Sequence, residues 1–311
     1  MSLTYTALAK KPRLFYQLTT LSVQEFDTLT RKLKPEWEKR EYARKAKRPK
    51  RIRKVGQGHP YFGDFATLVL LLVMYARTSC ANALLGILFG ISEPTVSNIS
   101  HKLLPLLQDR FLPQTFLRKP RSRVNTLDEL LLTYPELSVV IVDGCDIATR
   151  RPKRRQKKNY SGKSKKHVKK TVLLVHHDDG IILGKAKFRP GSVHDKRLLG
   201  EDPLHRHLNT RRNLLKYADS AWQGEDPLQG WRVVKRARRN NPLTKKEKRT
   251  NRSLSKIRIK VEHAIRRVKV FRRIGDKTMF RMKGKIDQTF NVAMNLANFK
   301  QLLRNPLPAG A

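Results

Sequence analysis

Two acidic residues stand at positions where a protein could do chemistry on a ligand. Asp143 follows an apolar run over residues 139–142, and Asp219 follows another over residues 214–218. In open α/β sheets, ligands bind at the carboxyl ends of the strands, so we expect both carboxylates to line a site. Asp also ends many strands as an ordinary turn residue, so neither acid alone is sufficient evidence for a ligand site.

A third acid, Glu262, lies where the local charge makes an acid unusual. Residues 232–273 contain 18 Lys or Arg and only two acids. The apolar side chains around Glu262 recur at helical spacing, and Glu262 falls at the border of their stripe, in line with Arg258, Arg266 and Lys269. One interpretation is a plain ion pair. The other is a metal ligand, because three carboxylates on rigid elements suit two Mg²⁺ ions that promote phosphodiester cleavage.

The charge of the whole chain indicates a nucleic-acid partner. Lys and Arg number 68 against 25 Asp and Glu, a formal net charge of +43. An excess of this size is suited to neutralising phosphates and releasing their counterions. The longest apolar run, residues 66–76, is too short to span a bilayer, so we expect no membrane partner. The two cysteines and the absence of a secretory leader predict a cytoplasmic, nucleoid-associated protein.

Residues 82–110 have the layout of a helix-turn-helix. A first helix over 82–89 would end at Gly90, and Ser92 would cap a second helix with Pro94 in its first turn. Val96, Ile99 and Leu103 would face inward. The opposite face would then contact bases and phosphates in a major groove, through Thr95, Ser97, Asn98, His101 and Lys102.

The N-terminal and C-terminal parts of the chain differ in their predicted secondary structure. The N-terminal part has a helix with a Ser22–Glu25 capping box and a basic run over 39–54 that we interpret as a DNA-tracking arm. The C-terminal part has a short helix over 127–132, β-rich runs over 138–144, 171–177, 180–188 and 213–219, and helices over about 254–271 and 286–303. Between the last β-rich runs, Ser192 and Asp195 are expected to cap a helix reciprocally, and the alternative is that Asp195 is a fourth carboxylate near the metals. This order predicts an α/β domain with a central sheet. The expected domains are an N-terminal helix and basic arm (1–58), an all-α helix-turn-helix domain (59–112), a linker (113–126), a catalytic domain (127–305) and a tail (306–311).

Several other residues have two interpretations each. Residues 150–170 hold 12 Lys or Arg and no acid, which favours a DNA contact through Lys163, Lys166 and His167 over a solvated loop. The run His176–Asp179 is typical of a hairpin tip, because neighbours on a strand point to opposite faces and do not share a metal. Trp222 either stacks on a base or fills the edge of the core. Cys145 has no evident catalytic base and is interpreted as a core residue.

Six segments of the chain, taken in order, resemble a known family. The stretch from about 127 to 303 resembles the catalytic domain of insertion-sequence transposases of the DDE superfamily, within the family typified by insertion sequence five. Two departures from the family pattern are Ser255, where relatives place Tyr, and Cys145-Asp146, where relatives often have Thr-Glu. The matching segments are Ile141–Gly144, Asn159–Lys163 with Lys166 and His167, Gly191–Asp195, Asp219–Gly224, Leu243–Lys248, and Arg258–His263 with Lys269.

The resemblance implies a fold and a function. It implies a ribonuclease-H-like catalytic domain, a mixed sheet flanked by helices, in which Asp143, Asp219 and Glu262 are catalytic and bind two Mg²⁺ ions, with Mn²⁺ able to substitute. Arg258 and Lys269 would contact the DNA of the element's ends. The expected function is a DNA transposase that binds terminal inverted repeats, cleaves and joins DNA strands, and acts as a homodimer or larger assembly on double-stranded DNA. The alternatives are a catalytically silent, transposase-derived DNA-binding protein and a basic RNA-binding protein.

Overall fold

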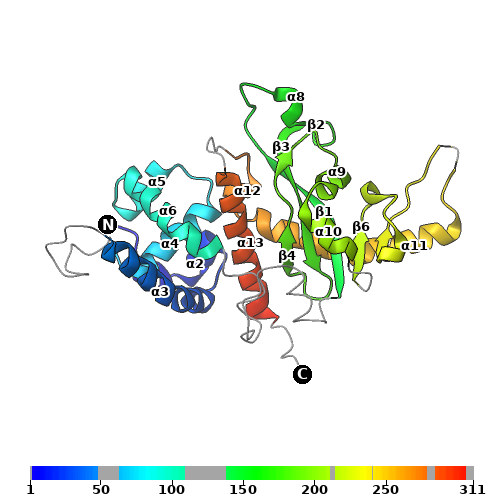
Figure 1. The fold of residues 1–311 in the computed structure, drawn as a ribbon. Helices are drawn as coiled ribbons and strands as arrows, with labels where there is room; N and C mark the ends of the chain where they lie inside the picture. Colours follow the sequence, from blue (N-terminus) through cyan, green and yellow to red (C-terminus); the bar gives the residue numbers. More distant parts are fainter. Residues whose placement is uncertain are drawn as a thin grey trace. The chain divides into compact units, whose positions relative to one another are not determined.

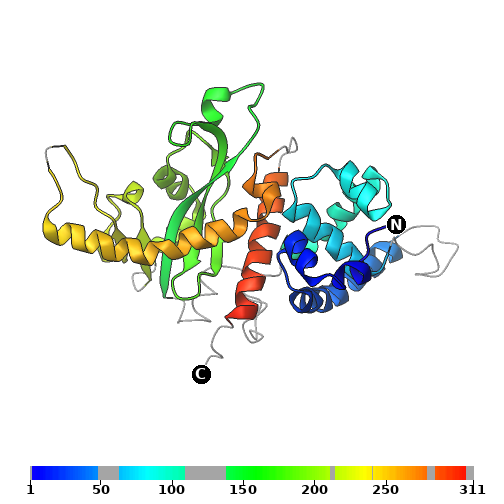
Figure 2. The same ribbon diagram turned by 180° about the vertical axis from the view of Figure 1, so that it is seen from behind.

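The structure, a computed structural model, divides the chain into two compact units (Figures 1 and 2). The first comprises residues 1–110 with 271–273, and the second comprises residues 111–270 with 274–311. The expected linker over 113–126, the short helix over 127–132, the tail over 306–311 and part of the basic arm lie outside the described residues. The structure describes residues 2–47, 63–108, 138–210, 214–239, 241–278 and 284–305.

The first unit is built from α-helices around one buried helix. Every residue from Thr67 to Ala76 in α4 is buried, which explains why this run is apolar on all sides. The capping box at Ser22 and Glu25 starts α3 as predicted, and Phe26 and Leu29 are buried on that helix. The helices of this unit are α1 (Tyr5–Ala9), α2 (Pro12–Thr19), α3 (Val23–Ala46), α4 (Phe65–Arg77), α5 (Asn82–Phe89) and α6 (Glu93–Gln108).

Helices α5 and α6 confirm the predicted helix-turn-helix elements. Helix α5 spans Asn82–Phe89, and Gly90 ends it in the left-handed conformation with φ of 67°. This conformation favours glycine, which has no Cβ to clash with the following carbonyl. Helix α6 begins directly after Ser92, whose hydroxyl lies 2.8 Å from that of Thr95. The predicted inward side chains Val96, Ile99 and Leu103 are all buried.

The second unit contains a mixed sheet in the order β2-β3-β1-β6-β7, with β4 and β5 also paired to β3. Strand β1 is antiparallel to β3 on one side and parallel to β6 on the other. Its parallel pairing with β6 ends at Val142 and Ala218, immediately before Asp143 and Asp219. The strands are β1 (Val139–Ala148), β2 (Tyr160–Ser161), β3 (Lys166–His176), β4 (Ile182–Lys185), β5 (Arg189–Pro190), β6 (Leu215–Ala218) and β7 (Trp231–Val233).

Helices cover both faces of this sheet. Helix α11 crosses one face, where it contacts β1, β3 and β6, while α9 and α10 lie on the opposite face (Figures 1 and 2). Buried side chains of β1, β3, α9 and α10 form one continuous core on that opposite face. The helices are α8 (Gln156–Asn159), α9 (Asp195–Gly200), α10 (Pro203–Thr210), the 3₁₀ turns η3 (Ser220–Trp222) and η4 (Pro227–Gln229), α11 (Lys245–Lys269), α12 (Arg272–Gly275) and α13 (Lys285–Arg304).

Two helix starts differ from the sequence prediction. Helix α11 begins at Lys245, nine residues before the predicted start, because Thr244 and Glu247 form a capping box. The predicted reciprocal cap between Ser192 and Asp195 is wrong: the N-cap of α9 is His194, and Asp195 instead pairs with Lys170. Helix α13, by contrast, matches its predicted bounds to within a residue. Among the residues described by the structure, no helix is long and apolar enough to cross a membrane.

Candidate active site

Asp143, within β1, and Asp219, directly after the parallel strand β6, share one cation. Arg258, on α11, places its Nη2 atom 3.3 Å from Asp143 Oδ2 and its Nη1 atom 3.7 Å from Asp219 Oδ1. The exposed fractions of these side chains are 14% for Arg258, 17% for Asp143 and 29% for Asp219. The two predicted acids therefore meet, and a guanidinium lies between them. The prediction that Asp143 ends its strand is wrong, because pairing with β3 continues β1 to Ala148.

The backbone orients both carboxylates. Oδ1 of Asp143 accepts a hydrogen bond of 2.8 Å from the Gly144 amide, which leaves Oδ2 to face Arg258. Oδ1 of Asp219 accepts from the Ser220 amide and so caps the 3₁₀ turn η3. Each acid is thus both a local turn residue, as Asp often is, and a member of a shared cluster.

Burial makes Asp143 dependent on a nearby positive charge. Desolvation raises the pKa of the Asp143 carboxyl above its usual value, and the charge of Asp219 adds to this rise, while Arg258 and the Gly144 amide oppose it. The ionised form of a buried carboxylate is costly unless a cation compensates it. In the structure Arg258 supplies that compensation.

Glu262 lies on the same helix as Arg258 but outside this cluster. Its side chain is exposed, one helical turn beyond Arg258, and it makes no ion pair with another residue that the structure describes. Within the described ranges, no three or more His, Cys, Asp or Glu side chains are grouped so as to hold a metal ion. The structure therefore brings Asp143 and Asp219 together, whereas Glu262 lies outside their cluster, one helical turn beyond Arg258.

The donor set nevertheless fits a divalent cation. Asp143 and Asp219 present hard carboxylate oxygens, which Mg²⁺ prefers, and a positive charge already occupies the space between them. Glu262 is the nearest further carboxylate along α11, at the i+4 position from Arg258. These three residues are the ones that would hold the metal.

Comparison with known proteins identifies the family of the chain. Residues 142–298 match the family described as DDE superfamily endonuclease, and residues 65–113 match the helix-turn-helix of DDE superfamily endonuclease. A relative described as a probable transposase for insertion sequence element IS702, from Microchaete diplosiphon, is 30% identical over 208 residues, which cover 65% of this chain and 69% of the relative. The chain belongs to the DDE-superfamily insertion-sequence transposases. No solved structure matches it.

The helix-turn-helix of this transposase presents its predicted DNA-reading residues on α6. Asn98 and His101 are exposed, and Thr95, Ser97 and Lys102 are half-buried, whereas the opposite side of the helix is packed in the core. This arrangement leaves polar side chains of α6 accessible to a partner.

The basic segment before β3 forms an ordered hairpin rather than a free loop. Strands β2 and β3 pair Tyr160 with His167 and Ser161 with Lys166. The rings of Tyr160 and His167 meet edge to face at 5.5 Å, and Lys163 and Lys166 are exposed beside them. Cations and an aromatic ring on one projecting hairpin are suited to a nucleic-acid strand.

The structure also gives the positions of the other residues that the sequence singled out in this transposase. On α11, Arg266 is exposed and Lys269 is half-buried. Trp222 is only 1% exposed and belongs to the core, so it does not stack on a base. Cys145 is buried, and burial raises the pKa of its thiol to about 12, which confirms it as a core residue.

Sequence reasoning missed an ion pair packed against the active-site strand. Lys170 Nζ lies 3.3 Å from Asp195 Oδ1, and both side chains are mostly buried. A Cβ atom on Gly144 would lie 2.8 Å from Asp195 Oδ2, so glycine at this position gives Asp195 its space. The adjacency of Asp143 and Gly144 was visible in the sequence, but the partner of Gly144 was not.

Proposed function

We propose that this transposase cleaves DNA at the ends of its element and joins the freed ends to target DNA, using Asp143, Asp219 and Glu262 as a metal-binding catalytic triad. The observation that carries the proposal is the convergence of Asp143 and Asp219, from strands far apart in sequence, on one cation. Two carboxylates brought together at part-buried strand positions are costly, and ion binding is the function that accounts for them.

The three acids would have distinct tasks. Asp143 and Asp219 are held by backbone amides and would keep the metal in a fixed position against the sheet. Glu262 is on a helix surface and would complete the ligand set by rotating its side chain towards them. The bound ions, two Mg²⁺ or Mn²⁺, would activate the attacking water or 3′-hydroxyl and stabilise the leaving oxygen.

Arg258 would change its partner during the reaction, from the two carboxylates to a phosphate of the DNA. Without metal, its guanidinium neutralises Asp143 and Asp219. If Asp143 and Asp219 held a metal ion, the guanidinium of Arg258 would no longer be needed to neutralise them and would be available to a phosphate oxygen of the DNA strand. Arg266 and Lys269 on the same helix would add phosphate contacts.

The proposed fold of the second unit is the ribonuclease-H-like fold. Its support is the mixed sheet, in which β1 is antiparallel to β3 and parallel to β6, with α11 across one face. Asp143 in the central strand and Asp219 after its parallel neighbour are positions at which such a sheet binds ligands.

The DNA partner would be held at several places. The exposed face of α6, through Thr95, Ser97, Asn98, His101 and Lys102, would read the terminal inverted repeats in the major groove. The β2–β3 hairpin would contact the backbone through Lys163, Lys166 and His167. Cutting two ends in one reaction favours a homodimer or larger assembly on DNA, and a protein with this task would be associated with the nucleoid.

The decisive experiment incubates the purified full-length protein with Mg²⁺ or Mn²⁺ and duplexes carrying the element's own ends. We expect nicked ends and joined products from the wild type, and no products from Asp143→Asn, Asp219→Asn or Glu262→Gln, with DNA binding retained. Asp146→Asn is the matched control, because Asp146 is another acid of β1 whose partner is Ser164 rather than Arg258.

Two outcomes would count against the proposal. Cleavage by Asp143→Asn at the wild-type rate would show that the triad is wrongly assigned. Specific binding to the element's ends without any metal-dependent cleavage by the wild type would favour the catalytically silent DNA-binding protein instead.

A further inference from the structure

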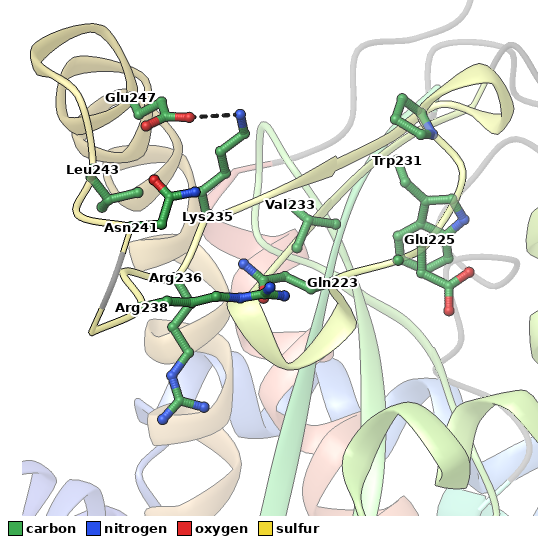
Figure 3. Close-up of a pocket in the computed structure, with 12 residues that line it drawn as sticks. Gln223, Glu225, Trp231, Val233, Lys235, Arg236, Arg238, Asn241, Leu243 and Glu247 are labelled. Atoms are coloured by element: carbon green, nitrogen blue, oxygen red, sulfur yellow. Dashed lines mark hydrogen bonds and ion pairs between the residues drawn. The ribbon is translucent and has the colours of Figure 1, made fainter.

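A concave pocket lies between the end of the η3 turn, strand β7 and the segment that leads into α11 (Figure 3). Its volume is about 410 Å³, within the range of ordinary ligand sites. Apolar side chains, among them Trp231, Val233 and Leu243, form part of the lining, and Gln223 and Asn241 add amide groups. None of these residues belongs to the proposed triad or to the proposed DNA contacts.

The two acids of the pocket lining are already neutralised. Glu247 lies 2.9 Å from Lys235 Nζ, the contact drawn as a dashed line in Figure 3. Glu225 lies 3.7 Å from Lys196 Nζ and 3.3 Å from His205 Nε2. Neither acid is therefore free to attract a cation into the pocket.

The two arginines of the lining, in contrast, have no partner. Arg236 and Arg238 are exposed, and neither guanidinium has an ion pair or a hydrogen bond with any residue that the structure describes. Since the acids are paired and the arginines are not, the pocket carries an uncompensated positive charge. A ligand of this pocket would therefore be an anion.

The segment that carries the arginines is held in place by hydrogen bonds. The side-chain amide of Asn251 accepts from the Lys235 amide at 3.0 Å and donates to the Lys235 carbonyl at 2.8 Å. The backbones of Arg238 and Asn241 bond each other in both directions, at 3.2 and 3.1 Å. A fixed backbone reduces the entropy lost when the arginines bind, so the site is preorganised.

We infer that this pocket binds the phosphates of a DNA strand next to the candidate active site, through Arg236 and Arg238. A guanidinium donates two parallel hydrogen bonds to a phosphate, which a lysine does not. Gln223 follows Asp219 by four residues, so the two Cα atoms are at most about 14 Å apart. With one phosphate per roughly 3.4 Å of helix axis in each strand, the side of the pocket formed by Gln223 lies within about four nucleotides of Asp219, so the pocket would bind the strand near the carboxylates. The inference rests on the proposed function, because it assumes that DNA is the substrate.

The test measures DNA binding by fluorescence anisotropy over a series of salt concentrations, with EDTA present so that no cleavage occurs. The pocket variant carries Arg236→Gln and Arg238→Gln. The control variant carries Arg249→Gln and Arg252→Gln, which remove the same charge from exposed positions of α11 outside the pocket.

A plot of the logarithm of the binding constant against the logarithm of the salt concentration has a negative slope. We expect the magnitude of this slope to be smaller by about two in the pocket variant, one for each lost phosphate contact. In the control variant we expect it to change by less than half as much. Replacing single phosphates of the duplex with neutral methylphosphonates refines the result. Substitutions within about four nucleotides of the cleavage position should weaken the wild type and leave the pocket variant unaffected, because its contacts there are already lost.

The outcomes separate the two proposals. Equal slopes for the pocket and control variants, or methylphosphonate effects that are the same in the pocket variant and the wild type, would overturn the phosphate pocket while leaving metal-dependent cleavage intact. A wild type that binds and cleaves no DNA would instead overturn the proposed function.

Discussion

Replacing Arg258 tests whether one guanidinium holds the carboxylates of Asp143 and Asp219 together in the absence of metal. Arg258→Gln keeps a polar side chain, although a shorter one, and removes the charge. The matched control is Arg252→Gln, an exposed arginine of the same helix. Both proteins are compared with the wild type in EDTA and in Mg²⁺.

The size of the effect follows from the distances. At 3.3 and 3.7 Å, with an effective dielectric constant of about 20, each attraction is about 4–5 kcal/mol. Desolvation of the three part-buried charges offsets a large part of this sum. Removing one partner also leaves Asp143 uncompensated, with a pKa already raised by burial. We therefore expect Arg258→Gln to lower the free energy of unfolding by about 3 kcal/mol in EDTA, near the lower end for a broken buried pair.

The assay follows thermal unfolding by tryptophan fluorescence in proteins that also carry Trp37→Phe, so that the signal comes from Trp222 and Trp231, which are both buried in the second unit. A loss of about 3 kcal/mol corresponds to roughly 6–12 °C for a unit of this size. Mg²⁺ should stabilise Arg258→Gln more than the wild type, because the ion no longer competes with the guanidinium for the carboxylates. An unchanged melting temperature for Arg258→Gln in EDTA, or an equal Mg²⁺ shift in both proteins, would refute the reasoning.

Three further substitutions test other parts of the second unit. Lys216 is fully buried, and burial lowers its pKa to about 8. The unfolded chain therefore binds more protons between about pH 8 and 10.5, and the free energy of unfolding rises with pH in that window. Lys216→Met should remove most of this rise in thermal melts recorded across the window, and the smaller remainder would come from Lys169 and Lys285, whose pKa values burial also lowers. Asn298→Leu removes both hydrogen bonds of the Asn298 amide to the Ile182 backbone, at 2.9 and 2.8 Å, and should cost about 2–4 kcal/mol in urea unfolding. Gly144→Ala should displace Asp195 and cost about 1–3 kcal/mol, with slower DNA cleavage.

Each of these substitutions has an outcome that would contradict it. A pH-dependent rise of undiminished size in Lys216→Met would assign the proton uptake to another group. Asn298→Leu with unchanged urea stability would mean that the Ile182 backbone finds other partners. Gly184→Ala, at a glycine with nothing within 4 Å of the added methyl group, is the control for Gly144→Ala, and equal effects would remove the role assigned to Asp195.

The sequence predicted the elements whose signals are local. The turn at Gly90, the capping box at Ser22 and the strand before Asp143 each depend on a few adjacent residues, and the structure has all three. The start of α11 was missed, although its capping box at Thr244 was readable, because its first two turns are basic and carry no apolar stripe. The three-residue strand β7 was missed because so short a segment has no recognisable period.

The candidate site was predicted only in part, because its geometry depends on long-range pairing and on rotamers. Apolar runs before Asp143 and Asp219 indicated two strand ends, but not that the strands are parallel neighbours. Strand β1 also continues to Ala148, because β3 pairs with it beyond the point where the apolar run stops. The position of Glu262 at the border of the stripe placed it near the acids, but could not predict that Arg258 would bridge Asp143 and Asp219 instead.

The separation of these residues along the chain has a consequence for synthesis on the ribosome. The helix-turn-helix is complete at Gln108, whereas Arg258 and Glu262 lie on α11, about 150 residues later. At roughly 5–20 residues per second, a nascent chain spends about 8–30 seconds with its first helices available and no cutting site. A polypeptide terminated before Lys245 retains the residues of the helix-turn-helix but lacks α11, so it would occupy DNA without cutting it.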